Sequence, residues 1–409
     1  MKEQKRVPKL RFVEFSDEWE DEKVGMLGTF KGGGTPSTNK SEYWQGETPW
    51  ISSSDIKEND IHNINISRYL SELAITESAT KVIPKGSILF VARVGIGKVA
   101  VANQDLCTSQ DFANLIPRKD DSYYIAYYFI SKSKLLFQHS QGTSIKGFTT
   151  GDLKSIPINI PTLPEQQKIA SFLSSVDKKI AQLQQKKRLL EDYKKGVMQQ
   201  IFPSACSGQV PQLRFTKAGG SAYPNWEEKR LGDVCEIVGG GTPKTSKGEY
   251  WNGNIQWFTP TEIKKDFVNE SIRKLSKLGL KKSSAKILPV GTILMTTRAT
   301  IGEVAITLKE CTTNQGFQSL IVNKDNNNVF IFNWVKMNKH QLLKRANGST
   351  FSEISKSEIE KIKVSTPSKE EQTKIADFLS VIDKKIAVVQ AQIEHTQQFK
   401  KGLLQQMFV

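Results

Sequence analysis

The sequence predicts an α+β fold of two duplicated α/β globules joined by two long α-helices, which form an antiparallel coiled coil with pseudo-twofold symmetry. Three observations support this prediction. Long segments of the 409-residue chain recur about 206 residues later. Each copy begins with mixed strand, turn and helix signals. Each copy then ends in a proline-free stretch that carries apolar residues at heptad spacing.

The internal repeat covers most of the chain. GGGTPSTNKSEYWQGETPW at 32–50 returns as GGGTPKTSKGEYWNGNIQW at 239–257. EQQKIASFLSSVDKKIA at 165–181 returns as EQTKIADFLSVIDKKIA at 371–387. The offset barely changes, so the sequence is a tandem duplication, and its period is that of a whole domain. We therefore expect four segments: a globule at 1–163, a helix at 164–202, a second globule at 203–367 and a helix at 368–409.

Strand and helix signals alternate within each globule. Ser87–Ala92 and Thr292–Thr297 are rich in β-branched and apolar residues and follow Pro-x-Gly turns, which predicts two strands. Tyr123–Leu136 and Val329–Leu343 have amphipathic spacing, which predicts one helix in each copy. Such a mixture is typical of an α+β globule.

The two long helices carry one seam each. Apolar residues follow in alternating steps of four and three, as in a coiled coil, and Lys187, Lys194, Thr396 and Lys400 fill the polar positions of the seam. We favour antiparallel pairing because the copies should be related by a twofold; the alternative is that each helix packs only on its own globule. The residues assigned to the coiled coil and to an interface for partner subunits are Ile169, Leu173, Val176, Ile180, Leu183, Ile375, Leu379, Ile382, Ile386 and Val389.

The charge balance indicates a polyanionic partner. The chain has 58 Lys and Arg against 42 Asp and Glu, a net charge of +16, which favours nucleic acid over an anionic membrane. Residues 203–367 carry 24 basic against 14 acidic residues, whereas residues 1–163 carry 20 against 19. If both globules bind DNA, we expect the second to supply more phosphate contacts.

Several classes of protein are excluded by what the sequence lacks. No apolar run approaches the roughly 18 residues of a membrane helix, and no signal peptide is visible, so we expect a cytoplasmic protein. Its four cysteines have no CxxC spacing and are expected to be reduced. We find no HExxH, no GxxxxGK[ST], no GxSxG and no NPPY-like tetrapeptide. The sequence therefore predicts a binding protein that holds no metal or cofactor of its own.

Two rival functions stay open at this point. A coiled-coil adaptor with basic globules would explain the helices but not the duplicated globules. A metal-dependent nuclease would use Asp55 and Glu262, which stand in acid-x-Lys fragments, but it needs a further carboxylate on the same metal. The GGG loops at 32–34 and 239–241 allow close approach of a phosphate or of a neighbouring strand.

The GGGTP…YW…W blocks and the EQxKIAxFLxxxDKKI helices, both duplicated at domain spacing, resemble the specificity (S) subunit of type I restriction–modification systems. The resemblance implies that each globule is a target recognition domain, which reads one half of an asymmetric bipartite sequence in double-stranded DNA. It implies that the helices hold the readers apart and recruit two modification (M) subunits, which methylate adenine with S-adenosylmethionine. Restriction (R) subunits, which use ATP and Mg, are optional further partners, and the S subunit itself is non-catalytic.

Candidate DNA-binding residues lie mainly where the two copies differ at matching places. Arg and Lys suit guanine, and Gln and Asn suit adenine. Arg93 and Arg298 follow equivalent strands, and we expect them at phosphates. The aromatic residues Tyr43, Trp44, Tyr250 and Trp251 could stack on a base, but we expect them to pack in the cores. The candidates are Thr35, Ser53, Arg93, Lys98, Gln141 and Lys146 in the first globule and Thr242, Lys244, Thr261, Arg298, Asn347 and Ser349 in the second.

Overall fold

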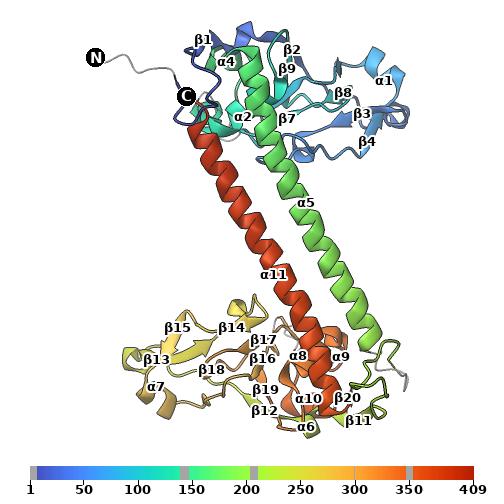
Figure 1. Ribbon diagram of the computed structural model, residues 1–409, viewed down its shortest axis with the longest axis vertical. Coiled ribbons are helices and arrows are strands. Elements are labelled where there is room, and N and C mark those ends of the chain that lie inside the picture. The colour runs from blue at the N-terminus through green and yellow to red at the C-terminus, as the bar shows by residue number, and fades with distance from the viewer. Residues whose placement is uncertain (1–6, 139–146, 203–210, 299, 347–352) are drawn as a thin grey trace. The chain divides into compact units, whose positions relative to one another are not determined.

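The computed structural model describes residues 7–138, 147–202, 211–298, 300–346 and 353–409. The chain forms two compact units: unit 1 comprises residues 1–185 and 390–409, and unit 2 comprises residues 186–389. Each long helix therefore contributes one stretch to each unit (Figure 1).

The globule of unit 1 mixes strands with short helices. Its strands are β1 (Glu20–Lys23), β2 (Gly28–Gly32), β3 (Thr48–Ile51), β4 (Arg68–Leu70), β5 (Val82–Ile83), β6 (Ile88–Val91), β7 (Val99–Val101), β8 (Leu106–Thr108), β9 (Phe112–Pro117) and β10 (Pro157–Ile160). Its helices are α1 (Glu72–Glu77), α2 (Ser122–Ser131), α3 (Ser133–Gln138) and α4 (Thr150–Ser155). The strands form sheets of order β2-β9-β6-β7 and β4-β3-β8-β5, and β1 pairs with β10.

The globule of unit 2 repeats this plan. Its strands are β11 (Glu227–Arg230), β12 (Cys235–Gly239), β13 (Trp251–Phe258), β14 (Phe267–Val268), β15 (Arg273–Leu275), β16 (Ile293–Met295), β17 (Val304–Thr307), β18 (Cys311–Thr313), β19 (Gln318–Val322) and β20 (Lys363–Thr366). Its helices are α6 (Leu231–Val234), α7 (Lys277–Lys281), α8 (Asn328–Met337), α9 (Lys339–Lys344) and α10 (Lys356–Glu360). The sheets have the orders β12-β19-β16-β17-β14, β15-β13-β18 and β11-β20. The predicted duplication of an α+β globule is confirmed.

The central strand of each globule is apolar on both faces. Ile88 and Phe90 of β6 join the core cluster that contains α2, whereas Leu89 and Val91 join a second cluster with Ile51. Successive side chains of a strand point to opposite faces, so a strand that is covered on both sides needs a continuous apolar run. This requirement explains the run Ile-Leu-Phe-Val and confirms the strands predicted at 87–92 and 292–297.

Each helix predicted after these sheets is broken into two. The first copy has α2 and α3 in place of one helix at 123–136, and the second has α8 and α9 in place of one at 329–343. Lys132 and Asn338 stand at the breaks with non-helical backbone, at ψ 29° and 20°. The Asn338 side chain donates to the carbonyl of Trp334 at 3.0 Å, which caps α8. Amphipathic spacing continues through both breaks, so it could not reveal them.

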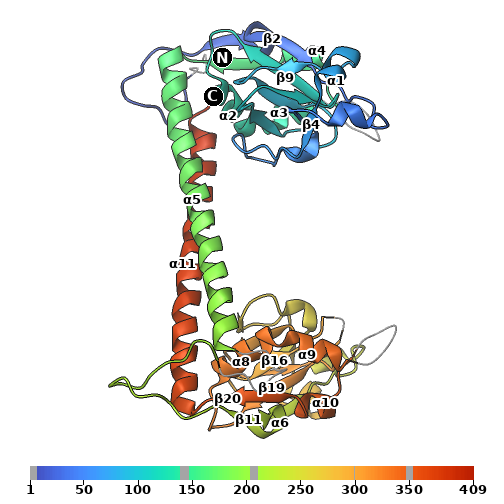
Figure 2. The same cartoon turned by 90° about the vertical axis from the view of Figure 1, so that its right-hand side faces the viewer.

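The long helices are α5 (Leu163–Ile201) and α11 (Lys369–Gln406). In unit 1, residues near the start of α5, among them Ile169 and Leu173, share a core cluster with Leu403 near the end of α11. In unit 2, Ile201 at the end of α5 shares a cluster with Ile375 near the start of α11. In both units the start of one long helix packs in the same cluster as the end of the other, so the helices pair antiparallel, as predicted (Figure 2).

Candidate nucleic-acid interface

The GGG loops pack against backbone of their own globules. The Gly34 amide donates to the Thr108 carbonyl at 2.8 Å, and the Gly241 amide donates to the Thr313 carbonyl at 2.8 Å. A Cβ at Gly34 would lie 2.6 Å from a backbone atom of Ala79. The structure therefore shows close approach of a neighbouring segment, which is one of the two uses left open for this loop.

The aromatic block behind each loop is structural. The Trp50 indole donates to the Gly34 carbonyl at 2.9 Å, and Trp257 makes the same bond to Gly241 at 2.9 Å. Trp50 lies edge-on to Trp44 at 5.1 Å between ring centroids, and its ring is covered by the Arg68 guanidinium at 4.4 Å. Tyr43, Trp44, Tyr250 and Trp251 all belong to these small core clusters, which confirms the expected core packing.

The threonine of each GGGTP loop is hydrogen-bonded to a glutamine side chain. The Thr35 hydroxyl donates to the Gln110 Oε1 atom, and the Thr242 hydroxyl donates to the Gln315 Oε1 atom. Both glutamines are exposed at the surface. With Oε1 engaged, the amide NH₂ group of each glutamine can still donate to a ligand. Gln110 and Gln315 are candidate readers that were not among the sequence candidates, although the pattern Thr-x-Gln-x-Phe recurs at 108–112 and 313–317.

The carboxylates of the nuclease alternative serve as turn caps. The Asp55 carboxylate accepts from the Ser52 amide at 2.7 Å and binds the Arg68 guanidinium. The Glu262 carboxylate accepts from the Thr259 amide at 2.7 Å and from the Ile272 amide at 2.7 Å. Within the described ranges, no three His, Cys, Asp or Glu side chains come together as a group that could hold a metal ion. These contacts assign both acids a structural role.

The other candidates in the first globule surround the turn after β6. The Lys98 ammonium donates to the Ser53 carbonyl at 3.0 Å, so these two candidates lie together, and Ser53 is 8% exposed. Arg93 is exposed and forms an isolated backbone bridge with Gly147. Gln141 and Lys146 lie outside the described residues.

In the second globule the equivalent turn carries acidic residues. Arg298 bridges Glu353 through the backbone, and its Nε atom lies 2.8 Å from the Glu353 carboxylate. Thr261 shares a hydroxyl–hydroxyl bond of 3.1 Å with Thr259, and Lys244 is exposed. Asn347 and Ser349 lie outside the described residues.

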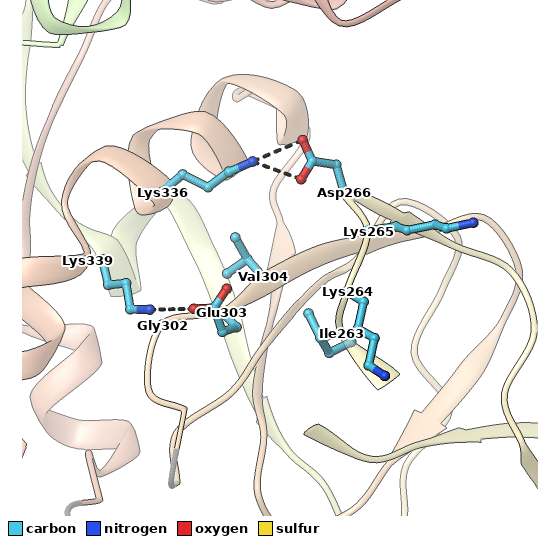
Figure 3. A pocket seen from close by; sticks show the side chains of 9 residues that line it. All are labelled: Ile263, Lys264, Lys265, Asp266, Gly302, Glu303, Val304, Lys336 and Lys339. Carbon is cyan, nitrogen blue, oxygen red and sulfur yellow. Dashed lines mark hydrogen bonds and ion pairs between the residues drawn. The ribbon is translucent and has the colours of Figure 1, made fainter. Parts of the chain in front are cut away.

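A pocket of about 280 Å³ lies beside this turn in the second globule (Figure 3). Its wall contains two ion pairs: Lys336 binds Asp266 at 2.8 Å, and Lys339 binds Glu303. Lys264 and Lys265 complete the cationic lining, and Lys265 extends away from both pairs in Figure 3. The lining therefore holds four lysines and two carboxylates, and each carboxylate is paired with one of the lysines.

The seam residues of the long helices are buried or partly buried. Ile386 is partly buried, and the other nine are 9% exposed or less. Two of the polar seam positions pair across the helices: Lys194 lies 2.6 Å from Asp383, and Lys400 lies 2.6 Å from Asp177. Lys187 pairs with Glu191 along its own helix at 3.6 Å. In this structure the ten seam side chains are therefore taken up by packing within the chain.

The EQ motif that opens each helix is also structural. The Glu165 carboxylate is 1% exposed and binds the Arg11 guanidinium through two bonds of 2.7 Å. Glu371 and Arg214 repeat the arrangement with bonds of 3.1 and 2.7 Å. Leu-Arg-Phe at 10–12 and 213–215 is therefore a further element of the repeat, which ties the start of each copy to its helix.

Cys107, Cys235 and Cys311 are buried free thiols, and burial raises the pKa of Cys235 to about 12. No helix in the described ranges has the length and apolar character to cross a bilayer. Cys206 lies outside the described residues.

Comparison with known proteins gives consistent results. Residues 16–192 and 223–396 each match the family described as "Type I restriction modification DNA specificity domain". The MjaIX specificity subunit of Methanocaldococcus jannaschii is 30% identical over 66% of this chain and 64% of its own length, so that match spans just under two thirds of the relative. The putative MjaX specificity subunit of the same organism is 26% identical over 97% of this chain and 94% of its own length. The crystal structure of the type I S subunit from M. genitalium has a TM-score of 0.63 at 17% identity, covering 98% of this chain and 99% of that one.

Proposed function

Because the chain belongs to the type I restriction–modification specificity-subunit family, we propose that its two globules read the two halves of one asymmetric bipartite sequence in double-stranded DNA. The long helices set the gap between the half-sites and recruit two M subunits. The chain itself carries out no chemistry. S-adenosylmethionine is bound by the M subunits, and ATP with Mg is used by R subunits where these join.

One observation carries the proposal: the two globules share their scaffold but differ on their surfaces. The Trp50–Gly34 and Gly34–Thr108 bonds recur with the same lengths in the second globule. The residue that bridges the arginine of this turn does not recur, because Gly147 beside Arg93 is replaced by the exposed Glu353 beside Arg298. Two readers on one scaffold with different surfaces should recognise different half-sites.

Recruitment of M subunits is assigned to the outward faces of the helices. The seam is filled, but Tyr193 and Phe399 are 54% and 50% exposed at equivalent positions of α5 and α11. Large exposed apolar side chains are enriched where proteins bind one another. One such residue on each helix fits one M subunit for each half of the molecule.

The experiment compares the chain alone with the chain bound to its cognate M subunits. Each preparation is incubated with S-adenosylmethionine and genomic DNA, and methylated adenines are mapped by sequencing. We expect methylation of one asymmetric bipartite motif by the complex and none by the chain alone. Methylation by the complex without a common motif would favour the adaptor, and cleavage of the DNA by the chain alone after addition of a divalent metal would favour the nuclease.

A further inference from the structure

The turn after the central strand carries an arginine at the same place in both globules. Arg93 follows β6 and forms an isolated antiparallel bridge with Gly147, and Arg298 follows β16 and forms the same bridge with Glu353. The bridges fix the same backbone register in both copies. Glu353 therefore stands beside Arg298 where the first globule has a residue without a side chain.

The charge around the two arginines differs in consequence. The Arg298 Nε atom lies 2.8 Å from the Glu353 Oε1 atom, and the side chains are 47% and 44% exposed. Arg93 makes no ion pair within the part of the chain that the structure describes. Asp111 bonds to the Arg93 amide through its backbone, but its carboxylate accepts from the Ser109 hydroxyl. Among the described residues, Arg93 thus offers a positive charge without a paired carboxylate, and Arg298 offers a positive and a negative group side by side.

The Arg298–Glu353 pair is unsuited to a phosphate. A phosphate is an anion and would be repelled by the neighbouring carboxylate. An exposed ion pair of this kind also contributes little to folding, so stability does not explain it. Its chemistry matches the major-groove edge of a G·C pair, where guanine N7 and O6 accept hydrogen bonds and the cytosine N4 amino group donates one. With Nε facing Glu353, the terminal NH₂ groups of Arg298 are available for guanine, and the carboxylate is available for cytosine.

We propose that Arg298 and Glu353 form a base-reading pair of the second globule that selects a G·C base pair, whereas Arg93 contacts a phosphate. The inference rests on the proposed function, namely that the second globule reads one half-site. At this turn the proposal gives the phosphate contact to the first globule, whereas the net charges led us to expect more phosphate contacts from the second.

The test uses the full chain in complex with its M subunits and short duplexes that carry each of the four base pairs at every position of the second half-site. The variants are Glu353→Gln, which removes the charge, and Glu353→Gly, which reproduces the residue of the first globule. Glu303→Gln is the matched control, because Glu303 also forms an exposed pair, with Lys339, in the same globule. Thermal unfolding checks that all variants are folded.

We expect both Glu353 variants and Arg298→Ala to lose preference for G·C at one and the same position. The loss should be about 5- to 150-fold, the range for a direct base contact. Glu303→Gln should keep the preference at that position. Equal tightening of binding to all duplexes in Glu353→Gln, with an unchanged base preference, would overturn the inference and leave the proposed function standing. A wild-type complex without any sequence preference would instead contradict the proposed function itself.

Discussion

The Lys400 ammonium on α11 lies 2.6 Å from the Asp177 carboxylate on α5, and both side chains are largely buried, at 10% and 16% exposure. The Tyr127 hydroxyl donates to the same carboxylate at 2.7 Å, and His62 lies 3.5 Å from it. The equivalent pair in unit 2, Lys194 with Asp383, has the same 2.6 Å separation. A charged residue in an otherwise apolar seam is stable only opposite its partner, so each pair specifies one register of the two helices.

This pair should make unit 1 sensitive to acid. Burial disfavours the charged form of Asp177, but the His62 hydrogen bond and the Lys400 charge together hold the pKa of its carboxyl below the usual range. A lowered pKa contributes stability above the unfolded value of about 3.9 that is lost as the pH falls through the folded value. Asp177→Asn should lose on the order of 3 kcal/mol of unfolding free energy at pH 7, and the difference from wild type should shrink below about pH 4. Denaturant unfolding at several pH values measures this, and a difference independent of pH would contradict the assignment.

Gly34 should be replaceable by no other residue. A Cβ there would lie 2.6 Å from backbone atoms of Ala79 and Thr80, and rigid backbone cannot yield cheaply. We expect Gly34→Ala to lower the unfolding free energy by about 2–3 kcal/mol and to weaken recognition of the first half-site. Gly32→Ala is the control, because a Cβ at Gly32 meets nothing within 4 Å. Thermal unfolding of both variants tests the comparison, and equal losses would contradict the packing argument.

Gln110 and Gln315 should each affect one half-site only. The Thr35 and Thr242 hydroxyls orient these exposed amides, and glutamine is the side chain that suits adenine. Gln110→Leu should relax one position of the first half-site, and Gln315→Leu one position of the second. The measurement is the methylated motif of each variant complex. A uniform loss of methylation at every site, without a change of motif, would mean that the glutamines support folding only.

The helices should act as a ruler. Both helices cross the boundary between the units, α5 after Gln185 and α11 after Val389. One added heptad at each place keeps the seam in phase and adds about 10 Å of helix, close to three base pairs of DNA. We expect unchanged half-sequences with a gap wider by about three base pairs. Four added residues at each place should disrupt the seam. Retained methylation with the original gap would contradict the ruler.

Much of the fold could be predicted from the sequence because the chain is duplicated, so each residue pattern that the fold requires occurs in both copies. The strand at 87–92, the aromatic core behind Gly34 and the heptad seam all follow from local pattern. The partners of Lys194 and Lys400 could not, because they depend on the antiparallel register of segments 189 and 223 residues apart. The Thr35–Gln110 and Arg298–Glu353 contacts were missed for the same reason: they join loops distant in sequence. The helix breaks at Lys132 and Asn338 depend on local capping, to which amphipathic spacing is insensitive.

To test directly whether each globule reads its own half-site, the first globule is replaced by a copy of the second. Leu231 donates its amide to the Ile362 carbonyl at 2.8 Å, and Val24 makes the equivalent bond to Ile156 at 3.0 Å, so these bonds mark matching junctions. Residues 24–156 are replaced by a copy of residues 231–362, and the methylated motif is mapped with the cognate M subunits. If each globule reads its own half-site, the motif becomes palindromic, with the second half-sequence at both ends. A folded chimera that still methylates the original asymmetric motif would contradict the assignment of one half-site to each globule.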